Sequence, residues 1–567
     1  MRILRVNMST LETTFEDLAD DQKILGGRGL TASILAKEVP PATDPLSAEA
    51  KLVIATGPLA GTMAPSCGRI SVGAKSPLTL GIKEANAGGP AAQKMDKLGI
   101  RAIIVEGQAA EGKLHLLSIN QDGPSLVSAD SYKGMKNYDL ADTLRSAYDE
   151  KITIISIGIA GERQWKSAAV SLTDKNGYFS RHAARGGLGA VMGAKGLKTI
   201  VLDDRGTSRV DMADKDAFQS TQKEWAALMK ADPGIQNMST YGTPGLINMF
   251  RPMGTMPALN YSADPVEGFE AVSSQGFEKM NQERGGKMDA CMPGCLVGCS
   301  VVYHDADGNH LTSSFEYETI ALMGTNLGIV DPDAIAKFDR IADDLGIDTI
   351  ELGSAMGLAA SAGKMTMGDA DSALKLLDEV EKGTEFGNIL GSGVVATASA
   401  LGIDRVPAVK GQAIPAHDPR VTKPTGVTYH TGPMGADHTA GITYEDPMAK
   451  EGQVERSLKV QIYTATQDAM GYCTLAAPGD KIKLLTFLAD LSNARYGTNT
   501  TIEDLIEIGR QTLRTELKFN EGTEIGTAHT DPAFMRTEAA ASGTVFDVDQ
   551  AEMASIWDNL DSIDPLA

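Results

Sequence analysis

Three cysteines lie within nine residues of this chain, and a fourth stands alone far downstream. Cys291, Cys295 and Cys299 share the segment CMPGCLVGC, and Cys473 follows 174 residues after the last of them. Thiolates are soft metal ligands, so three from one Gly/Pro-rich turn and one from elsewhere predict an iron–sulfur cluster. Structural zinc would favour paired C-x-x-C knuckles, which the sequence lacks. We therefore expect a fold that brings Cys473 to this turn.

A second motif occurs twice. D-x-x-G-x-D recurs later as D-x-x-G-x-C, and its final residue is the isolated cysteine. The two copies consist of Asp343, Gly346 and Asp348, and of Asp468, Gly471 and Cys473. A carboxylate beside a glycine turn accepts paired N–H donors from a flat heterocycle, and the glycine lets the backbone close over the ring. A helix with a glycine cap also produces D-x-x-G, but the shared cysteine makes the second copy more specific. The repetition predicts two copies of one ligand.

Charge and composition narrow the classes of partner. The 567 residues carry 52 basic and 74 acidic side chains, a formal net charge of −22, which disfavours nucleic acid and anionic membranes. Five cysteines are too few for a disulfide framework, and their clustering indicates a reducing compartment. The N-terminus has no apolar signal core, and no apolar run approaches the roughly 20 residues of a membrane helix. We expect a soluble cytoplasmic protein.

The order of local patterns predicts an α+β fold, with an N-terminal multi-sheet β-rich base followed by two mainly helical domains. Short β-branched runs such as KLVIATG from Lys51 and KITIISIG from Lys151 alternate with stretches too short for regular βαβ units. Apolar residues take helical spacing later, as in the runs from Asp214, Asp333 and Ser372. No tandem repeat is visible. The expected domains are 1–208, 209–405 and 406–567.

Several motifs, in this order along nearly the whole chain, resemble the aldehyde ferredoxin oxidoreductase family. Members of that family are tungsten enzymes with two pyranopterin dithiolenes and one 4Fe–4S cluster. The motifs are GGRGL at Gly26, GPLAGT at Gly57, APSCGR ending at Arg69, NAGG at Asn86, RHAARGGLGAVMGAK from Arg181, FEYET around Glu316 and GADH ending at His438, together with the clustered cysteines and both D-x-x-G copies. The resemblance implies that the β-rich base cradles a bis-pterin cofactor.

The resemblance also implies which residues bind that cofactor. The segment RGGLGAVMG fits neither common phosphate loop, yet its glycines let backbone amides approach the pterin phosphates. In the family a magnesium ion bridges those phosphates, and here the Asn86 side chain and the carbonyl of Ala183 or Ala184 would contribute to it. The implied cofactor-binding residues are Arg69, Asn86, Arg181, Ala183, Ala184, Arg185, Gly186 and Gly187, with Asp343, Gly346, Asp348, Asp468 and Gly471 of the duplicated motif. The dithiolenes supply the sulfur ligands of tungsten and four cysteines go to the cluster, so Cys67 is left over, either as a packed thiol or, from its place in APSCGR, as a contact on the pterin side.

The implied activity is oxidation of an aldehyde to a carboxylic acid, which needs a base and a donor that polarises the carbonyl. The family glutamate corresponds to Glu316 or Glu318, and spacing does not decide between them. The family histidine maps best to His438, with His430 as a second candidate. Electrons would leave through the cluster to ferredoxin or a small Fe–S subunit, and not to NAD, because the chain has no dinucleotide fingerprint.

Three alternatives stay open. The first is another reaction of the same family, such as reduction of a carboxylic acid or an aromatic thioester within a larger Fe–S complex. The second is a non-catalytic Fe–S electron-transfer protein, which would leave the paired D-x-x-G motifs unexplained. The third is molybdenum in place of tungsten. The chain also lacks the E-x-x-H motif with which some relatives hold iron between subunits, so a homo-oligomer would form without that bridge.

Overall fold

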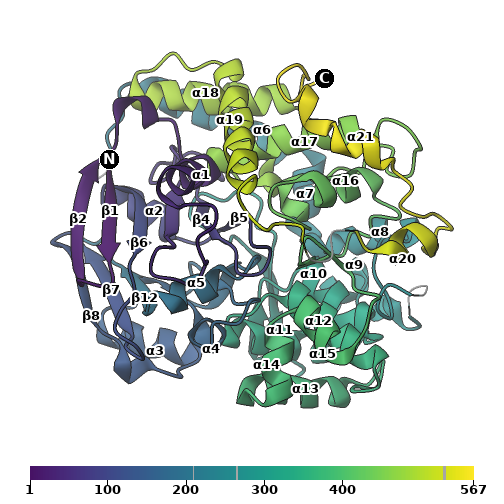
Figure 1. The fold of residues 1–567 in the computed structure, drawn as a ribbon. Coiled ribbons are helices and arrows are strands. Elements are labelled where there is room, and N and C mark those ends of the chain that lie inside the picture. Colours follow the sequence, from purple (N-terminus) through teal and green to yellow (C-terminus); the bar gives the residue numbers. More distant parts are fainter. Residues whose placement is uncertain (209, 263–265, 528–530) are drawn as a thin grey trace.

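The computed structural model describes residues 1–208, 210–262, 266–527 and 531–567. Its N-terminal part, coloured purple to blue in Figure 1, contains two six-stranded sheets, and a mostly helical region follows. Strands form where β-branched runs stand between turns, so that every residue of β3 (Leu52–Thr56) and β9 (Thr153–Ser156) is buried. The predicted fold class, a multi-sheet base followed by helices, is confirmed.

The two sheets share one topology. Their strand orders are β2-β1-β6-β3-β4-β5 and β8-β7-β12-β9-β10-β11. In the first sheet, β6 runs parallel to β1 and antiparallel to β3. In the second sheet, β12 runs parallel to β7 and antiparallel to β9 in the same way. The remaining strands are β1 (Arg2–Asn7), β2 (Glu12–Asp17), β4 (Ile70–Lys75), β5 (Ile82–Ala87) and β6 (Ile100–Glu106), and β7 (His115–Asn120), β8 (Gly123–Ser128), β10 (Val170–Thr173), β11 (Phe179–Ala183) and β12 (Leu197–Leu202). The base is therefore a structural duplication that the sequence pattern does not reveal.

The connecting helices repeat as well. After each initial hairpin comes a long helix, α1 (Gly27–Glu38) in the first unit and α3 (Asn137–Ala147) in the second. Before each last strand comes a short one, α2 (Ala91–Lys97) or α5 (Leu188–Ala194). Both short helices begin directly after a glycine-rich turn, so the two units present equivalent turns to the rest of the molecule.

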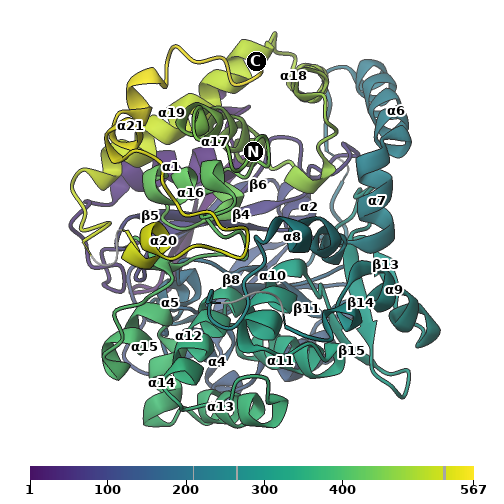
Figure 2. The same ribbon diagram turned by 90° about the vertical axis from the view of Figure 1, so that its right-hand side faces the viewer.

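The helical region begins with α6 (Lys215–Ala231) and includes α11 (Pro332–Leu345) and α13 (Ala370–Lys382), in agreement with the three predicted helical runs. An aspartate side chain caps each of these helices, and α11 and α13 each end on a glycine in the left-handed conformation. Later, α17 (Gln453–Ala469) packs against α19 (Ile502–Asn520) and against α1 of the base, and Figure 2 shows these three together.

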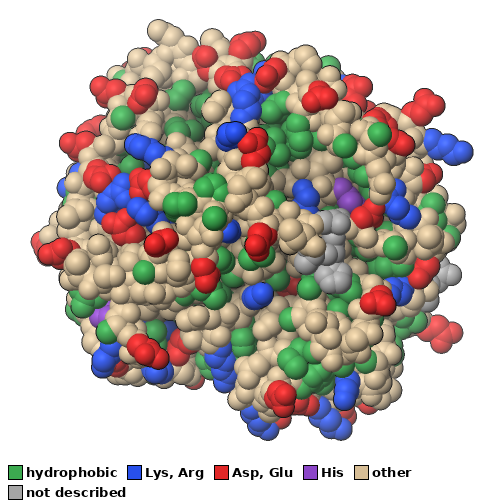
Figure 3. All heavy atoms as spheres, viewed as in Figure 1, with side chains coloured by type: hydrophobic (Ala, Val, Ile, Leu, Met, Phe, Trp, Pro, Cys, Tyr) green, Lys and Arg blue, Asp and Glu red, His purple; other side chains and the backbone are tan. Residues whose placement is uncertain are grey.

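A small third sheet frames the cysteine-rich turn. Residues 291–299 join β13 (Lys287–Asp289) to β14 (Ser300–His304), which pairs with β15 (His310–Ser313). The turn is thus held between neighbouring strands. None of the helices in the described part of the chain combines the length and apolarity needed to cross a membrane. On the face in Figure 3, acidic and basic side chains are interspersed.

Candidate active site

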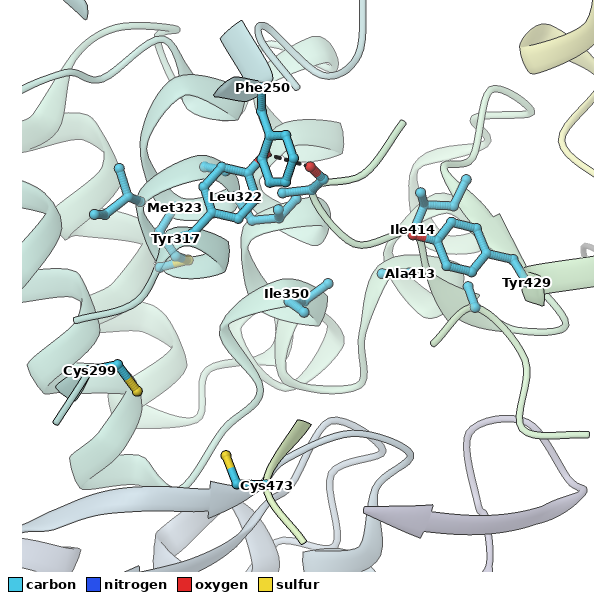
Figure 4. Close-up of a cluster of buried hydrophobic side chains, with 14 of the residues drawn as sticks. Phe250, Cys299, Tyr317, Leu322, Met323, Ile350, Ala413, Ile414, Tyr429 and Cys473 are labelled. Atoms are coloured by element: carbon cyan, nitrogen blue, oxygen red, sulfur yellow. Dashed lines mark hydrogen bonds between the residues drawn. The ribbon is translucent and has the colours of Figure 1, made fainter. Parts of the chain in front are cut away.

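The four cysteines of the predicted cluster come from segments that hydrogen bonds join. The backbone N–H of Cys473 donates to the carbonyl of Ser66 at 3.0 Å, and the N–H of Ser66 donates to that of Gly294 at 3.1 Å. The loop at Ser66 therefore joins the isolated cysteine to the cysteine-rich turn. In Figure 4 the sulfur atoms of Cys299 and Cys473 point toward one another. The remaining thiol, Cys67, is buried in the same apolar core.

Two arginines accompany these thiols. A hydrogen bond from Cys291 lowers the pKa of Cys295, whereas burial raises the pKa of Cys473. One guanidinium nitrogen of Arg69 lies 4.0 Å from the sulfur of Cys473. The hydrogen bond with Cys295 and burial raise the pKa of Cys291, and the positive charge of Arg181 acts against them. Four soft donors with two cations beside them fit a cluster bound through thiolates.

The second D-x-x-G copy lies at the end of α17. Asp468 is in the last turn of that helix, and Gly471 follows in the left-handed region with φ +64°. The buried carboxylate of Asp468 accepts a hydrogen bond from Nδ2 of Asn86 at 3.3 Å and one from Arg28 at 3.4 Å. Arg28 is 0% exposed and also pairs with Glu516 at 2.8 Å. The NAGG motif and this copy therefore meet in one place.

The first copy repeats the arrangement at the end of α11. Asp343 is in the last turn, and Gly346 follows with φ +72°. Nε2 of His182, from β11, lies 2.8 Å from the Asp343 carboxylate. His182 thus takes the place that Asn86, from β5, takes beside Asp468 in the other copy. Asp348 caps α12 (Thr349–Ser361) and accepts from Nε of Arg185 at 3.2 Å.

Each copy also packs against a glycine of the β-rich base. A Cβ on Gly57, after β3, would lie 2.2 Å from the carbonyl oxygen of Met470, and one on Gly158, after β9, would lie 2.2 Å from that of Leu345. Both distances are far below van der Waals contact, so only glycine fits. The duplicated base thus packs against the two motif copies in equivalent ways.

The glycine-rich loop between β11 and α5 contains the other residues expected at the cofactor. Ala183 ends β11, Ala184 follows, and Gly186 and Gly187 take left-handed φ values of +87° and +74°. Arg185 donates to the carbonyl of Ala413 at 2.7 Å. The other two arginines lie nearer the cysteines: Arg69 donates to the carbonyl of Asn86 at 3.1 Å, and Arg181 donates to Oγ of Ser300 at 2.6 Å.

The two candidate glutamates occupy different surroundings. Glu316 precedes α10 (Tyr317–Thr319), accepts a hydrogen bond from Ser314 at 2.8 Å and lies 4.0 Å from Arg181, on the side of the cysteines. Glu318 accepts from the N–H of Ala416 at 2.8 Å. Its Oε1 lies 3.6 Å from Nε2 of His438. The structure therefore pairs His438 with Glu318.

A second histidine, His417, completes this group. Its Nε2 lies 3.1 Å from Oε1 of Glu318, and the three titratable side chains have polar atoms within 4.8 Å of one another. Burial alone would raise the pKa of Glu318, but His438, His417 and the N–H of Ala416 outweigh it and lower the value to about 2. Burial lowers the pKa of His438 to about 4 against the opposing effect of Glu318. At neutral pH the glutamate is ionised and His438 is neutral.

Sequence reasoning named His430 and missed His417. His430 lies in α16 (Lys423–Thr431), stacks on Phe546 at 4.8 Å between ring centroids and places Nε2 3.4 Å from Asp531. Those contacts are separate from the Glu318 group. His417 stands in no motif, so nothing in the sequence marked it. The next residue, Asp418, helps to line a cavity of about 300 Å³.

The fold and this site define an oxidoreductase, and comparison with known proteins supports that class. The family model described as aldehyde ferredoxin oxidoreductase, N-terminal domain, matches residues 3–204, and the model for domains 2 and 3 matches residues 220–554. The chain belongs to the aldehyde ferredoxin oxidoreductase family, which confirms the predicted resemblance. The boundaries at residues 208 and 405 stay predictions.

Named proteins resemble this chain to different degrees. A tungsten-containing aldehyde ferredoxin oxidoreductase of Pyrococcus furiosus is 32% identical over 552 residues, covering 92% of this chain and 88% of the relative. A WOR-like subunit of an aliphatic sulfonate oxidoreductase from the same organism is 27% identical, covering 90% and 84%. The BamBC active-site complex of benzoyl-coenzyme A reductase superposes with a TM-score of 0.81 at 18% identity, covering 99% and 93%, and shows the shared fold.

Proposed function

We propose that this protein oxidises aldehydes to carboxylic acids with a tungsten bis-pterin cofactor and passes the electrons through a 4Fe–4S cluster. The pairing of Glu318 with His438 carries the proposal, because it supplies an ionised base beside a neutral imidazole. The name of the Pyrococcus furiosus relative supports tungsten and an aldehyde substrate. Molybdenum stays the alternative metal.

The residues fit the implied groups. Cys291, Cys295, Cys299 and Cys473 would hold the cluster, and Asp343 and Asp468 would each hold one pterin. A magnesium ion would use the Asn86 side chain and the carbonyl of Ala183 or Ala184. When bound, the tungsten–pterin group accepts the two electrons that aldehyde oxidation releases. A low-potential carrier such as ferredoxin or a small Fe–S subunit would take them one at a time, and the expected location is the cytoplasm.

The side chains of this chain would do the proton chemistry. Glu318, ionised at neutral pH, accepts a proton from the water that adds to the aldehyde carbon. His438 faces Glu318 with Nε2, while its Nδ1 is buried without a hydrogen-bond partner among the described residues. In a neutral imidazole that turns Nε2–H toward the ionised Glu318, Nδ1 carries a lone pair and would accept a hydrogen bond, for example from the water that attacks the aldehyde.

The runner-up is a different reaction of the same family, such as reduction of an acid or an aromatic thioester with further Fe–S subunits as partners. The sulfonate and benzoyl-coenzyme A relatives are named for other substrates. A non-catalytic electron-transfer role accounts less well for Glu318 and its two histidines.

The test uses anaerobically purified protein, metal analysis and a panel of aldehydes with a viologen dye as acceptor. Glu318→Gln and His438→Gln should each lower turnover by about 10²-fold or more, the usual scale for positioned acid–base groups. Glu316→Gln is the matched control and should retain more activity, with metal and iron content unchanged in all three. If fully metallated protein reduces no viologen with any aldehyde, the runner-up takes the place of this proposal.

A further inference from the structure

We propose that His417 and Tyr444 form a proton exit path from Glu318 toward solvent. This inference rests on the proposed function and extends it. Oε1 of Glu318 lies 3.1 Å from Nε2 of His417, and Nδ1 of the same ring lies 3.3 Å from the hydroxyl of Tyr444. The imidazole therefore has a different oxygen partner at each nitrogen. A ring of this kind accepts a proton at one nitrogen and releases one from the other.

The reaction requires such a path. An aldehyde and water give a carboxylic acid, two protons and two electrons, and the bound cofactor would supply the acceptor for the electrons. Glu318 takes up a proton from the attacking water and must lose it before the next turnover. The Glu318 side chain is 15% exposed and His417 is 3% exposed. When a substrate covers the exposed part of Glu318, the released proton has to leave through the protein, and His417 is the neighbour that contacts the carboxylate at Oε1.

The ring of His417 is held in one orientation. Phe250 packs edge-on against it with ring centroids 5.1 Å apart, and Tyr317 lies 5.4 Å away. The hydroxyl of Tyr317 donates to the carbonyl of Ala416 at 2.6 Å, which fixes the backbone just before His417. Figure 4 shows Tyr317 and Phe250 side by side. The aromatic packing thus keeps one ring nitrogen toward Glu318 and the other toward Tyr444.

Tyr444 leads outward. It lies between α16 and α17 in a segment without helix or strand, its residue is half-buried, and the next two residues, Glu445 and Asp446, are exposed. The path therefore runs from the partly exposed Glu318 through the buried His417 to the half-buried Tyr444, which precedes two exposed carboxylates. His417 and Tyr444 do not touch the substrate in this proposal. They pass on the proton that Glu318 has accepted.

The chain offers a matched control. The hydroxyl of Tyr429 also contacts His417, at 3.2 Å, but it donates to the backbone carbonyl and not to the ring. Tyr429→Phe and Tyr444→Phe each remove one hydroxyl from a tyrosine that touches this residue. Only the second change interrupts the path. A merely structural effect would be as large in Tyr429→Phe, which is the more deeply buried of the two.

The kinetic experiment measures viologen reduction with a saturating aldehyde in H₂O and in D₂O. We expect Tyr444→Phe to lower kcat about 10-fold and His417→Gln about 10²-fold, the scale of acid–base steps, with KM little changed. The solvent isotope effect on kcat should rise in Tyr444→Phe. Tyr429→Phe should stay within about 2-fold of the wild type. Equal kcat values for Tyr444→Phe and Tyr429→Phe would overturn the path.

A second readout does not depend on turnover. Full-length oxidised protein with ¹⁵N-labelled histidines should give a ring resonance for His417 that His417→Gln removes. Tyr444→Phe should shift its Nδ1 signal, and Tyr429→Phe should leave it in place. No shift in Tyr444→Phe would overturn the contact itself. Wild-type protein without aldehyde turnover overturns the proposed function, whereas wild-type turnover with an unaffected Tyr444→Phe variant overturns the exit path alone.

Discussion

The two D-x-x-G copies hold the same kind of carboxylate by the same means, yet they end differently. Asp343 and Asp468 each lie in the last turn of a helix, before a left-handed glycine and opposite a side chain from the edge strand of one sheet. The Asp468 copy ends in Cys473, beside the other thiols. The Asp343 copy ends in Asp348, which caps a helix. A duplicated scaffold thus carries two equivalent sites, and one residue decides which of them meets the predicted cluster.

The copies also differ in charge. Asp468 faces Arg28, a buried cation shared with Glu516. Asp343 faces His182 and lies near the buried Asp339, which shares the hydroxyl of Thr312 with it. Burial raises the pKa of Asp339, as does the charge of Asp343. Asp468 therefore has a permanent positive partner, whereas the basic partner of Asp343 among the described residues is a histidine.

The largest expected effect tests the last residue of each copy. Cys473→Ala should remove most of the cluster iron, because a 4Fe–4S cluster needs a fourth ligand. Asp348→Ala, the same position in the other copy, should leave the iron in place. Cys67→Ala controls for the loss of a buried thiol. Iron analysis and the visible absorption of anaerobic protein measure the cluster content. Full iron content in Cys473→Ala would show that Cys473 is not a cluster ligand.

The second prediction tests whether the two aspartates do the same work. Asp343→Ala or Asp468→Ala leaves ring donors of a bound pterin unpaired, at about 1–3 kcal/mol for each lost partner, or roughly 10- to 100-fold in affinity. Tungsten or molybdenum and pterin content should fall in both variants. Asp344→Ala, whose carboxylate accepts from the backbone of Tyr138 instead, is the control. Full metal content in both test variants would refute two equivalent pterin sites.

The third prediction concerns the glycines of the base. Gly57→Ala and Gly158→Ala place a methyl group against a backbone oxygen, so each should lower the free energy of unfolding by about 1–3 kcal/mol. Gly363→Ala is the control for Gly158→Ala, because both glycines have a left-handed φ, and Gly479→Ala is the control for Gly57→Ala, because neither has one. A Cβ on Gly363 or Gly479 would have no atom within 4 Å. Denaturant unfolding measures the difference. Test and control variants of equal stability would show that the close approach has no energetic weight.

A feature could be predicted from the sequence when a short motif carries it. The cysteine spacing and both D-x-x-G copies are short patterns whose residue types indicate their chemistry, so they could be found without a structure. Glu316 and Glu318 could not be separated in this way. They are two residues apart, but one precedes the short helix in extended conformation and the other lies within it, so their side chains contact different neighbours.

The missed features depend on contacts between distant segments. His417 contacts Glu318 only because the segment before α16 lies against α10. Arg28 and Asp468, which also meet, are 440 residues apart in the sequence. The duplicated topology of the base is recorded in strand pairing and not in matching residues, since Asn86 in one unit corresponds to His182 in the other. Residue type alone could not show that an amide and an imidazole fill the same role.

The smallest expected effect asks whether these two side chains are interchangeable. His182 contacts the Asp343 carboxylate with Nε2 at 2.8 Å and Oγ of Ser171 with Nδ1 at 3.0 Å. In His182→Asn the amide N–H₂ takes the place of Nε2 beside the Asp343 carboxylate, as Asn86 does in the other copy, but the shorter side chain gives up the hydrogen bond with Ser171. The net loss of one hydrogen bond predicts about 0.5–1.5 kcal/mol of stability, measured by denaturant unfolding, with pterin content retained. His182→Ala removes both contacts and should cost more. If His182→Asn loses its pterin as completely as Asp343→Ala, the imidazole has a role that the amide of the other copy does not share.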